Sequence, residues 1–477
     1  MAWSDEIVSS TYPVRVEFEP EHEALATAVL GSAERAWQRE IVELGYPPPF
    51  TRGDPPKVGM LFEIKSTGLG AGAGMAHWED DVASTPNSDC SGIVVIDSAT
   101  LPDDEGLDET VFHELNHTTQ YATDCTEPPS AYEGFTIAAV RDEFPDSDIV
   151  PWVIEQFQQF PEYPLDYWTM TFPCSGSQPC FPYQLGAALF PMYLMDRYGQ
   201  SEPEVLVDIF GRFAQDGSTI ISPPHPHCTM PNHPNWFEGV EAFLLEHGVT
   251  FADAFCEFSA WRAIVGEYDD GGHFSRGDEI APPRVSASIA PTDATLPFEV
   301  HEYGSRYIEV NADPALPSNG WRVSVSANPG AIWCGSVLNW HQDGSVTREP
   351  LVFEGGQGRG ELADLAQVSR TLLVVSQQQD DSHVPDDKNY AQVRSFSIGF
   401  EREEVDSGVP EAGQDALVDT ETDAAEGSVD ATMDPDARPS EENASCDCRM
   451  GVPRRSEGVP LALLLAVSLM LRRTRLR

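Results

Sequence analysis

The segment DETVFHELNHTTQY, residues 108–121, contains the pattern His-Glu-x-x-His. Residues four apart share one face of an α-helix, so His113 and His117 can direct ring nitrogens at the same metal ion. Glu114 lies beside the first histidine, within reach of a metal-bound water as a general base. The pattern has this chemical meaning only on a helix, so it predicts one here, shortly after a buried strand at 92–97. Two histidines alone cannot hold a catalytic zinc, so a third ligand is required.

The third ligand decides the class of site. A metzincin would need Gly at 120 and His at 123, so Gln120 and Thr123 exclude that class. A gluzincin takes a glutamate from a second helix, and Glu133 lies near the start of the next predicted helix, PPSAYEGFTIAAV. We therefore predict a Zn²⁺ site with His113, His117 and Glu133 as ligands. Weaker candidates are Asp124 and Glu127 in the connecting turn, Glu143, and the loop histidines His225, His227 and His233.

Hydrophobic periodicity predicts an α+β chain whose first part mixes strands with many helices. Asp108 is the predicted N-cap of the motif helix. The glycine-rich segment 66–78 is predicted as a loop; it lacks the Gly-Lys-Ser/Thr ending of a phosphate-binding loop. The predicted strands are 14–19, 57–65 and 92–97. The predicted helices are 21–44, 129–141, 148–159, 182–198, 202–214, 235–247 and 250–266.

From about residue 284 the pattern changes to short strands separated by Pro, Asn, Gly and Asp, which predicts a β-sandwich of about 115 residues. Residues 403–445 are acidic and nearly free of large apolar groups, so they are predicted to be a disordered stalk. The predicted domains are a catalytic domain at 1–280, the β-sandwich at 284–402, the acidic linker at 403–445 and a C-terminal tail at 446–477.

The net charge of the 477-residue chain is −50, and only three lysines are present. Such an acidic surface repels nucleic acid and anionic lipid head groups, so neither is an expected partner. The charge fits a solvated surface in salty surroundings and says nothing about the fold.

The nine cysteines are dispersed without paired Cys-x-x-Cys knuckles, which favours disulfides in an oxidising compartment over a structural zinc ribbon. Candidate pairs are Cys90 with Cys125 and Cys174 with Cys180, with Cys228–Cys256 as a third, but the sequence does not decide the connectivity. Cys334 is then left unpaired.

The C-terminal tail combines SCDC, about 13 apolar residues at 459–471 and four arginines. The apolar run is shorter than the roughly 20 residues of a membrane span. This arrangement resembles the MYXO-CTERM sorting domain of myxobacterial surface proteins, which implies contact with the membrane, cleavage by a sorting protease and display at the cell surface. The alternative is an ordinary tail anchor. The N-terminus does not resemble a signal peptide, so we expect the true start to lie upstream.

Four segments resemble, in order and spacing, a family of secreted gluzincin metallopeptidases from myxobacteria and related bacteria. They are VFHELNHTTQY, YEGFTIAAV, YQLGAALFPMYLMDRYG and FADAFCEFSAWRAIVGEYDDGGHF. The resemblance covers about residues 12–400. It implies a zincin-like fold and a zinc peptidase with the ligands named above, Glu114 as catalytic base and a protein or peptide substrate. The chain departs from related patterns at Asn116, where a bulkier residue is common, and in the short spacing of its ligands.

Tyr183, at the start of YQLGAALF, is the candidate for stabilising an oxyanion, because gluzincins often place a Tyr or His on a later helix. Its alternative is a tyrosine buried in the core. Tyr121 is expected to pack near the ligands. Asp142 and Glu143 could accept a hydrogen bond from a ligand imidazole, or could be solvated helix charges.

Two other functions compete with the zinc peptidase. One is a cell-surface binding or adhesion protein with a vestigial zincin fold, which the β domain and stalk would suit. It requires a degenerate site, whereas His113, Glu114, His117 and Glu133 are all present. The other keeps the zinc but hydrolyses something other than peptides.

Overall fold

The computed structural model describes residues 5–51, 57–65, 74–81, 89–99, 104–167, 179–214, 234–291, 295–312, 315–378 and 393–402. The chain divides into two units, Met1–Glu403 with Val459–Arg477 and Glu404–Gly458. All described residues belong to the first unit. They end at residue 402, so the predicted acidic linker and sorting tail lie outside them. Within the described residues, no helix is both long and apolar enough to cross a membrane.

The first part of the chain is built on a mixed seven-stranded sheet. Its parallel centre comes from the three strands predicted from the sequence, and Phe62 of β5 is paired with Val94 of β7. The strand order is β1-β2-β5-β7-β3-β4, with β6 also paired to β7 and antiparallel to it. The bounds are β1 Asp5–Val8, β2 Val14–Phe18, β3 Phe50–Thr51, β4 Lys57–Val58, β5 Met60–Lys65, β6 Gly74–Asp81 and β7 Cys90–Asp97. The loop predicted over 66–78 is thus wrong at its end, where β6 begins.

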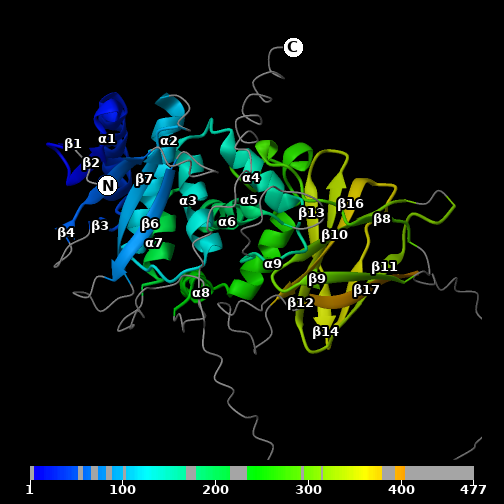
Figure 1. The fold of residues 1–477 in the computed structure, drawn as a ribbon. Coiled ribbons are helices and arrows are strands. Elements are labelled where there is room, and N and C mark those ends of the chain that lie inside the picture. The colour runs from blue at the N-terminus through cyan, green and yellow to red at the C-terminus, as the bar shows by residue number, and fades with distance from the viewer. Residues whose placement is uncertain are drawn as a thin grey trace, which may run out of the picture. The chain divides into compact units, whose positions relative to one another are not determined.

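Helices pack on this sheet and continue the core away from it. Helices α1 and α2 lie side by side against the sheet (Figure 1), with α1 on β2 and α2 on β6 and β7. One core joins Phe62 of the sheet to Val111 of α2 and Phe135 of α3. The α-helices are α1 Glu23–Trp37, α2 Asp104–Tyr121, α3 Pro129–Glu143, α4 Ile149–Gln158, α5 Phe181–Gly186, α6 Leu189–Tyr198, α7 Glu204–Gly211, α8 Trp236–Glu246 and α9 Phe251–Trp261.

Three helix predictions need correction. Helix α2 starts at Asp104, so Asp108 is not its N-cap; its carboxylate instead accepts hydrogen bonds from Ser32 and Arg35 of α1. The helix predicted over 21–44 ends in a π-helical turn, Gln38–Leu44. The helix predicted over 182–198 is divided into α5 and α6, and Gly186 lies so close to the backbone of Val153 that a Cβ there would clash with its carbonyl oxygen.

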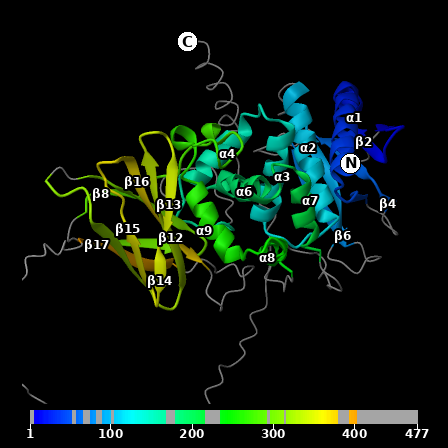
Figure 2. The same ribbon diagram turned by 180° about the vertical axis from the view of Figure 1, so that it is seen from behind.

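The C-terminal strands form two five-stranded sheets that pack against one another, as the predicted sandwich requires (Figure 2). Val323 and Ile398 of one sheet share a buried core with Val337 and Val375 of the other. The sheet orders are β13-β12-β16-β10-β8 and β14-β15-β11-β17-β9. The bounds are β8 Ala287–Ile289, β9 Leu296–His301, β10 Ser305–Val310, β11 Trp321–Ala327, β12 Ile332–His341, β13 Val346–Pro350, β14 Val352–Glu354, β15 Gln357–Glu361, β16 Val368–Gln378 and β17 Val393–Arg402. The protein is therefore an α+β structure with several sheets.

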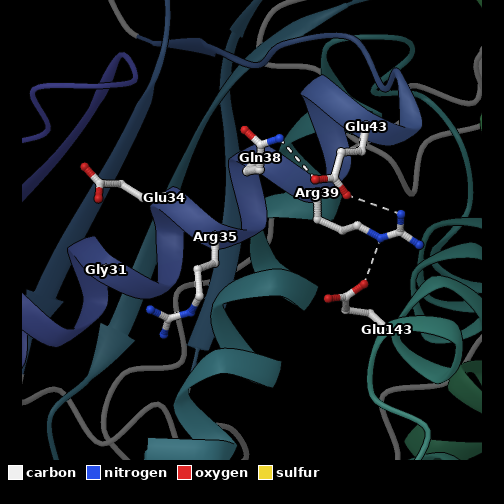
Figure 3. Close-up of a pocket in the computed structure, with 7 residues that line it drawn as sticks. All are labelled: Gly31, Glu34, Arg35, Gln38, Arg39, Glu43 and Glu143. Atoms are coloured by element: carbon white, nitrogen blue, oxygen red, sulfur yellow. Dashed lines mark hydrogen bonds and ion pairs between the residues drawn. The ribbon is translucent and has the colours of Figure 1, made fainter.

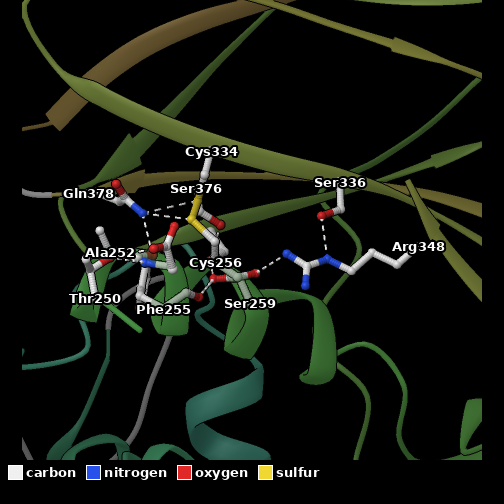
Figure 4. Close-up of a disulfide and its surroundings, with 12 residues drawn as sticks. Thr250, Ala252, Phe255, Cys256, Ser259, Cys334, Ser336, Arg348, Ser376 and Gln378 are labelled. Carbon is white, nitrogen blue, oxygen red and sulfur yellow. Dashed lines mark hydrogen bonds between the residues drawn. A yellow bond between two sulfur atoms is a disulfide. The ribbon is translucent and has the colours of Figure 1, made fainter. Parts of the chain in front are cut away.

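A disulfide between Cys256 of α9 and Cys334 of β12 joins the helices to the sandwich (Figure 4). Gln378 of β16 donates its side-chain amide to the carbonyl oxygen of Ala252, one turn earlier on α9, at 2.6 Å. The hydroxyl of Tyr307 donates to the carbonyl oxygen of Ser259 at 2.8 Å. Covalent and polar contacts thus fasten α9 to the β-sheet that follows it.

The disulfides only partly follow the sequence predictions. The predicted pair Cys90–Cys125 is confirmed. The pair Cys228–Cys256 and an unpaired Cys334 are both wrong, because Cys256 and Cys334 bond to each other. Cys180 is also disulfide-bonded, and its predicted partner Cys174 lies outside the described residues.

Replacing Cys256 with Ser should leave Cys334 as a free thiol. Alkylation of the denatured, unreduced variant followed by peptide mapping should place the extra label on Cys334. Because the bond closes a loop with a sequence separation of 78, we expect the free energy of unfolding, measured in urea, to fall by about 2–4 kcal/mol. A label on Cys228 instead of Cys334 would show that Cys256 pairs with Cys228, as the sequence suggested.

Candidate metal centre

Helix α2 brings the two motif histidines together. The Nε2 atoms of His113 and His117 are 3.0 Å apart, and the ring planes are nearly perpendicular at 89°. The opposite face of the helix is apolar, because Val111 and Leu115 are fully buried in the core. The core thereby fixes which way the histidines face.

Glu133 of α3 completes a group of three candidate ligands. Its Oε2 lies 3.3 Å from Nε2 of His113 and 3.5 Å from Nε2 of His117. A zinc ion with bonds of about 2.0–2.1 Å and tetrahedral angles requires ligand atoms about 3.3 Å apart. The three measured separations match this edge length. Oε2 of Glu133 is also buried and accepts no hydrogen bond among the described residues, as suits an atom that faces a cation.

The turn before α3 places Glu133 at the site. Pro129 occupies the first turn of α3. Backbone N–H groups there have no acceptor within the helix, so the missing N–H of proline costs no hydrogen bond. The hydroxyl of Tyr132 donates to the carbonyl oxygen of Asp124 at 2.8 Å and accepts from the amide of Glu127 at 3.2 Å. These bonds fold the connecting turn against the start of α3. Glu133 is therefore held by the same turn that contains the competing carboxylates.

The competing ligands are engaged elsewhere. The carboxylate of Asp124 accepts from the amide and hydroxyl of Thr126, and Oε2 of Glu127 accepts from the amide of Trp236 at 3.1 Å. Glu143 is paired with Arg39 at 2.8 Å. His225, His227 and His233 lie outside the described residues. Of the residues proposed from sequence, only His113, His117 and Glu133 converge in the described structure.

Glu114 lies between the ligands and the edge strand β6. The side chain is only 8% exposed, and its Oε2 accepts a hydrogen bond from the amide of Ala76 at 2.6 Å. Burial raises the pKa of this carboxyl, and the negative charge of Glu133 adds to the effect, while His113 and His117 oppose it. A carboxyl with a raised pKa is better suited to take up and return a proton near neutral pH.

Strand β6 approaches Glu114 closely only because residue 74 is a glycine. A Cβ on Gly74 would lie 2.8 Å from Cγ of Glu114 and 2.8 Å from Cγ2 of Thr110. Both distances are shorter than real Cβ contacts. Sequence reasoning had placed Gly74 and Ala76 in a loop, and their contact with the motif helix was not visible in any pattern.

Asp142 and Glu143 were candidates either for accepting a hydrogen bond from a ligand imidazole or for solvated helix charges, and both pair with Arg39. Asp142 and Glu143 both bind the guanidinium of Arg39, Asp142 at 3.1 Å, and Glu143 and Arg39 line a pocket on the surface of α1 (Figure 3). Nδ1 of His117 instead faces Oε1 of Gln120 at 2.9 Å. In the sequence, Gln120 served only to exclude a metzincin. Its position, a polar residue three after a ligand histidine, was the signal that could have identified it as the partner of His117.

The two tyrosines have different surroundings. The ring of Tyr121 stacks parallel to that of His117, with centroids 6.4 Å apart, as expected of a packing residue. Tyr183 is fully buried, and its hydroxyl is within hydrogen-bonding distance of the carbonyl oxygens of Tyr163 and Pro164. This environment favours the alternative reading of Tyr183 as a core residue over a role in stabilising an oxyanion.

Charges at the site are strongly coupled. Burial lowers the pKa of His117, but the negative charges of Glu133 and Glu114 outweigh burial and raise the pKa to about 9. Burial raises the pKa of Glu133, but the two histidines outweigh burial and hold the pKa well below its ordinary value. The carboxylate is therefore ionised and ready to bind a cation, whereas His117 must first lose a proton.

No protein-family model matches the chain, and no curated protein matches it. Three solved structures show distant similarity. The pre-peptidase C-terminal domain of a collagenase from Bacillus anthracis is 10% identical, covers 25% of this chain and 100% of that domain, and has a TM-score of 0.19. AlgX from Pseudomonas aeruginosa is 12% identical over 23% of this chain and 26% of its own, with a TM-score of 0.16.

Aminopeptidase A from Legionella pneumophila, in complex with aspartic acid, is 11% identical and has a TM-score of 0.33. The match covers 77% of this chain and 37% of the aminopeptidase, so this chain spans little more than a third of that protein. All three TM-scores are below 0.5. What the site does must therefore be inferred from its own geometry.

Zinc binding should release about one proton from His117 at pH 7, because its pKa in the metal-free protein is about 9. The apparent zinc affinity should therefore rise with pH up to about 9. Calorimetric titration in two buffers of different ionisation enthalpy measures the proton release. The control variant His247→Gln, changed at the end of α8, should release the same number of protons on zinc binding. Proton release that does not depend on His117 would contradict its assignment to His117.

The metal-free protein should lose stability as the pH rises. The folded-state pKa of His117 lies above its ordinary value of 6.5. Protonation therefore stabilises the fold fully below about pH 6.5, and this contribution disappears as the pH approaches 9. Urea unfolding after treatment with a chelator should show this decrease, and His117→Asn should flatten it. A pH-independent free energy of unfolding in both proteins would contradict the ion pair.

Proposed function

We propose that this protein is a zinc-dependent peptidase of the gluzincin type. The observation that supports this most directly is the convergence of Nε2 of His113, Nε2 of His117 and Oε2 of Glu133 within 3.0–3.5 Å of one another. Glu114 lies beside them on the same helix. Three protein ligands leave a fourth position for water or substrate, which is the arrangement of catalytic zinc sites.

The roles of the side chains follow from their positions. Zinc held by His113, His117 and Glu133 would polarise the scissile carbonyl and lower the pKa of water to about 7. Oε2 of Glu114 is held by the amide of Ala76, so Oε1 is the oxygen that can accept a proton from the attacking water. Glu114 then passes this proton to the leaving amine. Burial raises the pKa of Glu114, which makes its carboxylate a stronger proton acceptor.

Strand β6 supports a peptide as the substrate. Within the described residues, β6 pairs only with β7, and it lies against α2 beside Glu114. An extended peptide could bind at such an edge as an additional strand through main-chain hydrogen bonds. We therefore propose that the substrate is a protein or peptide bound along β6, and that the mixed sheet with α2 and α3 is a zincin-like catalytic domain.

We also propose that the enzyme works outside the cytoplasm, at the cell surface or beyond it. The disulfides Cys90–Cys125 and Cys256–Cys334 support an oxidising location. The tail, 446–477, contains a Cys-x-Cys, an apolar segment and an arginine-rich segment. This arrangement supports cleavage of the tail by a sorting protease at the membrane and display at the cell surface. Fractionation of the producing cells, with an antibody against residues 284–402, tests this location.

Replacing Glu114 with Gln should abolish the activity and preserve the metal. We expect zinc content and affinity close to those of the wild type and casein cleavage lower by about 10²–10⁴-fold, because the proton acceptor is lost. Glu143→Gln is the matched control, since Glu143 pairs with Arg39 and touches no ligand. A fully active Glu114→Gln protein would remove this mechanism, and zinc-loaded wild type that cleaves no peptide would favour another substrate.

Replacing Gly74 with Val should displace Glu114 without removing the zinc. The new side chain would meet Cγ of Glu114 and Cγ2 of Thr110 at 2.8 Å. A displacement of about 1 Å can cost up to about 100-fold in rate, so we expect kcat to fall at least about tenfold with little change in zinc affinity. The second-site change Thr110→Ala relieves one of the two contacts and should restore part of the activity. Unchanged kcat would show that β6 does not position the base.

A further inference from the structure

A chain of buried polar side chains lies behind His117, on the side of the ring away from the candidate metal ligands. Nδ1 of His117 is 2.9 Å from Oε1 of Gln120 and 3.3 Å from Oγ1 of Thr136, which belongs to α3. Gln120 and Thr136 are fully buried. An imidazole that binds a metal through Nε2 must carry its hydrogen on Nδ1, so both neighbours would have to act as acceptors.

The surroundings of Gln120 turn its acceptor toward the ring. Its amide nitrogen Nε2 is 3.1 Å from the carbonyl oxygen of Tyr132, which can only accept a hydrogen bond. The NH₂ end of Gln120 is therefore directed at that carbonyl. Oε1 is left facing His117. A reversed amide would place Oε1 against the carbonyl oxygen of Tyr132, which is a second acceptor, and would lose the acceptor for the Nδ1–H of His117.

The surroundings of Thr136 have the same consequence. Its hydroxyl is 2.8 Å from Oδ1 of Asn116, and the Nδ2 of Asn116 donates to Oε2 of Glu40 at 3.1 Å. Because Asn116 directs its NH₂ at Glu40, its oxygen faces Thr136 and receives the single hydroxyl hydrogen. The oxygen lone pairs of Thr136 remain for the Nδ1–H of His117.

Glu40 ends this chain at a position with no access to water. It lies in the π-helical turn Gln38–Leu44 and is fully buried. Burial raises the pKa of its carboxyl well above the ordinary value. Burial therefore disfavours a negative charge at this end of the chain.

We propose that Gln120 and Thr136, the latter oriented by Asn116, are positioning residues that hold the Nδ1 hydrogen of His117 and so direct its Nε2 at the metal. The inference rests on the proposed zinc site and goes beyond it, because it assigns the orientation of one ligand to two independent acceptors. One acceptor comes from α2 and the other from α3. Both are neutral, so the ring is oriented without the added negative charge that a carboxylate acceptor would bring.

The test compares zinc dissociation constants for variants that alter only these acceptors. Gln120→Met and Thr136→Val keep the approximate volume of the side chain and remove the acceptor. Loss of such partners typically costs about 10–100-fold in metal affinity, so we expect zinc to bind at least about tenfold more weakly to each variant. Thr136→Ser restores the hydroxyl and should bind zinc within about threefold of the wild type.

Thr119→Val is the matched control. Thr119 is an equally buried threonine on α2, and its hydroxyl donates to the backbone carbonyl of Asn116 at 2.7 Å without touching His117. Its removal should change zinc affinity less than about twofold. In the zinc-loaded wild type, proton–nitrogen correlation spectra should show a slowly exchanging Nδ1–H on His117, and this proton should exchange faster in Gln120→Met and in Thr136→Val.

The outcomes separate the two proposals. Equal zinc affinity in the wild type, Gln120→Met and Thr136→Val would overturn the positioning role and leave the zinc peptidase intact. The positioning role would also be overturned if Thr119→Val lost as much zinc affinity as the other variants, or if zinc were coordinated by Nδ1 of His117. Zinc binding with the expected losses, but without casein cleavage, would support the positioning role and overturn the peptidase. A wild type that binds no zinc would overturn both.

Discussion

The buried polar contact between α2 and α3 is the interaction on which the candidate site depends. Helix α2 supplies both histidines and α3 supplies Glu133, so the ligand atoms converge only if the two helices keep one fixed register. Apolar packing alone tolerates small shifts along a helix, because it is not directional. Hydrogen bonds from Thr136 to Asn116 and from Gln120 to the carbonyl of Tyr132 are directional, and each is buried. A shift between the helices would leave these groups unpaired in the core, which is costly.

The sequence was informative wherever chemistry depends on local spacing. The histidines four residues apart identified one helix face, and Glu133 could be selected because Pro128 and Pro129 mark the start of its helix. The three central strands were also predicted from local sequence, the first of them from alternation. These features are set by neighbours within about ten residues along the chain, so a single sequence contains enough information to predict them.

Most of the missed features depend on contacts between segments distant in sequence; the contact of Gln120 with His117, three residues apart, is the local exception. Ala76 bonds to Glu114 across 38 residues, and Cys256 bonds to Cys334 across 78. Several cysteine pairings satisfy the same sequence equally well, so the choice is made by the tertiary structure. Asp142 and Glu143 had suitable charge and helical position, but Arg39, about 100 residues earlier, competes for both. Tyr183 began a helix as expected, yet nothing local revealed that its hydroxyl would turn toward backbone carbonyls.

The attachment of the sandwich to α9 affects how the protein would respond to proteolysis. Arg262, at the end of α9, is almost fully buried, with its guanidinium over the ring of Phe157 at 4.2 Å and near the ring of Tyr307 in β10. A single backbone cut anywhere between residues 257 and 333 would leave two pieces still joined through Cys256 and Cys334. A cut before Tyr307 would also leave Arg262 enclosed by aromatic rings from both pieces. A clipped protein would therefore stay assembled for as long as this crosslink remained oxidised.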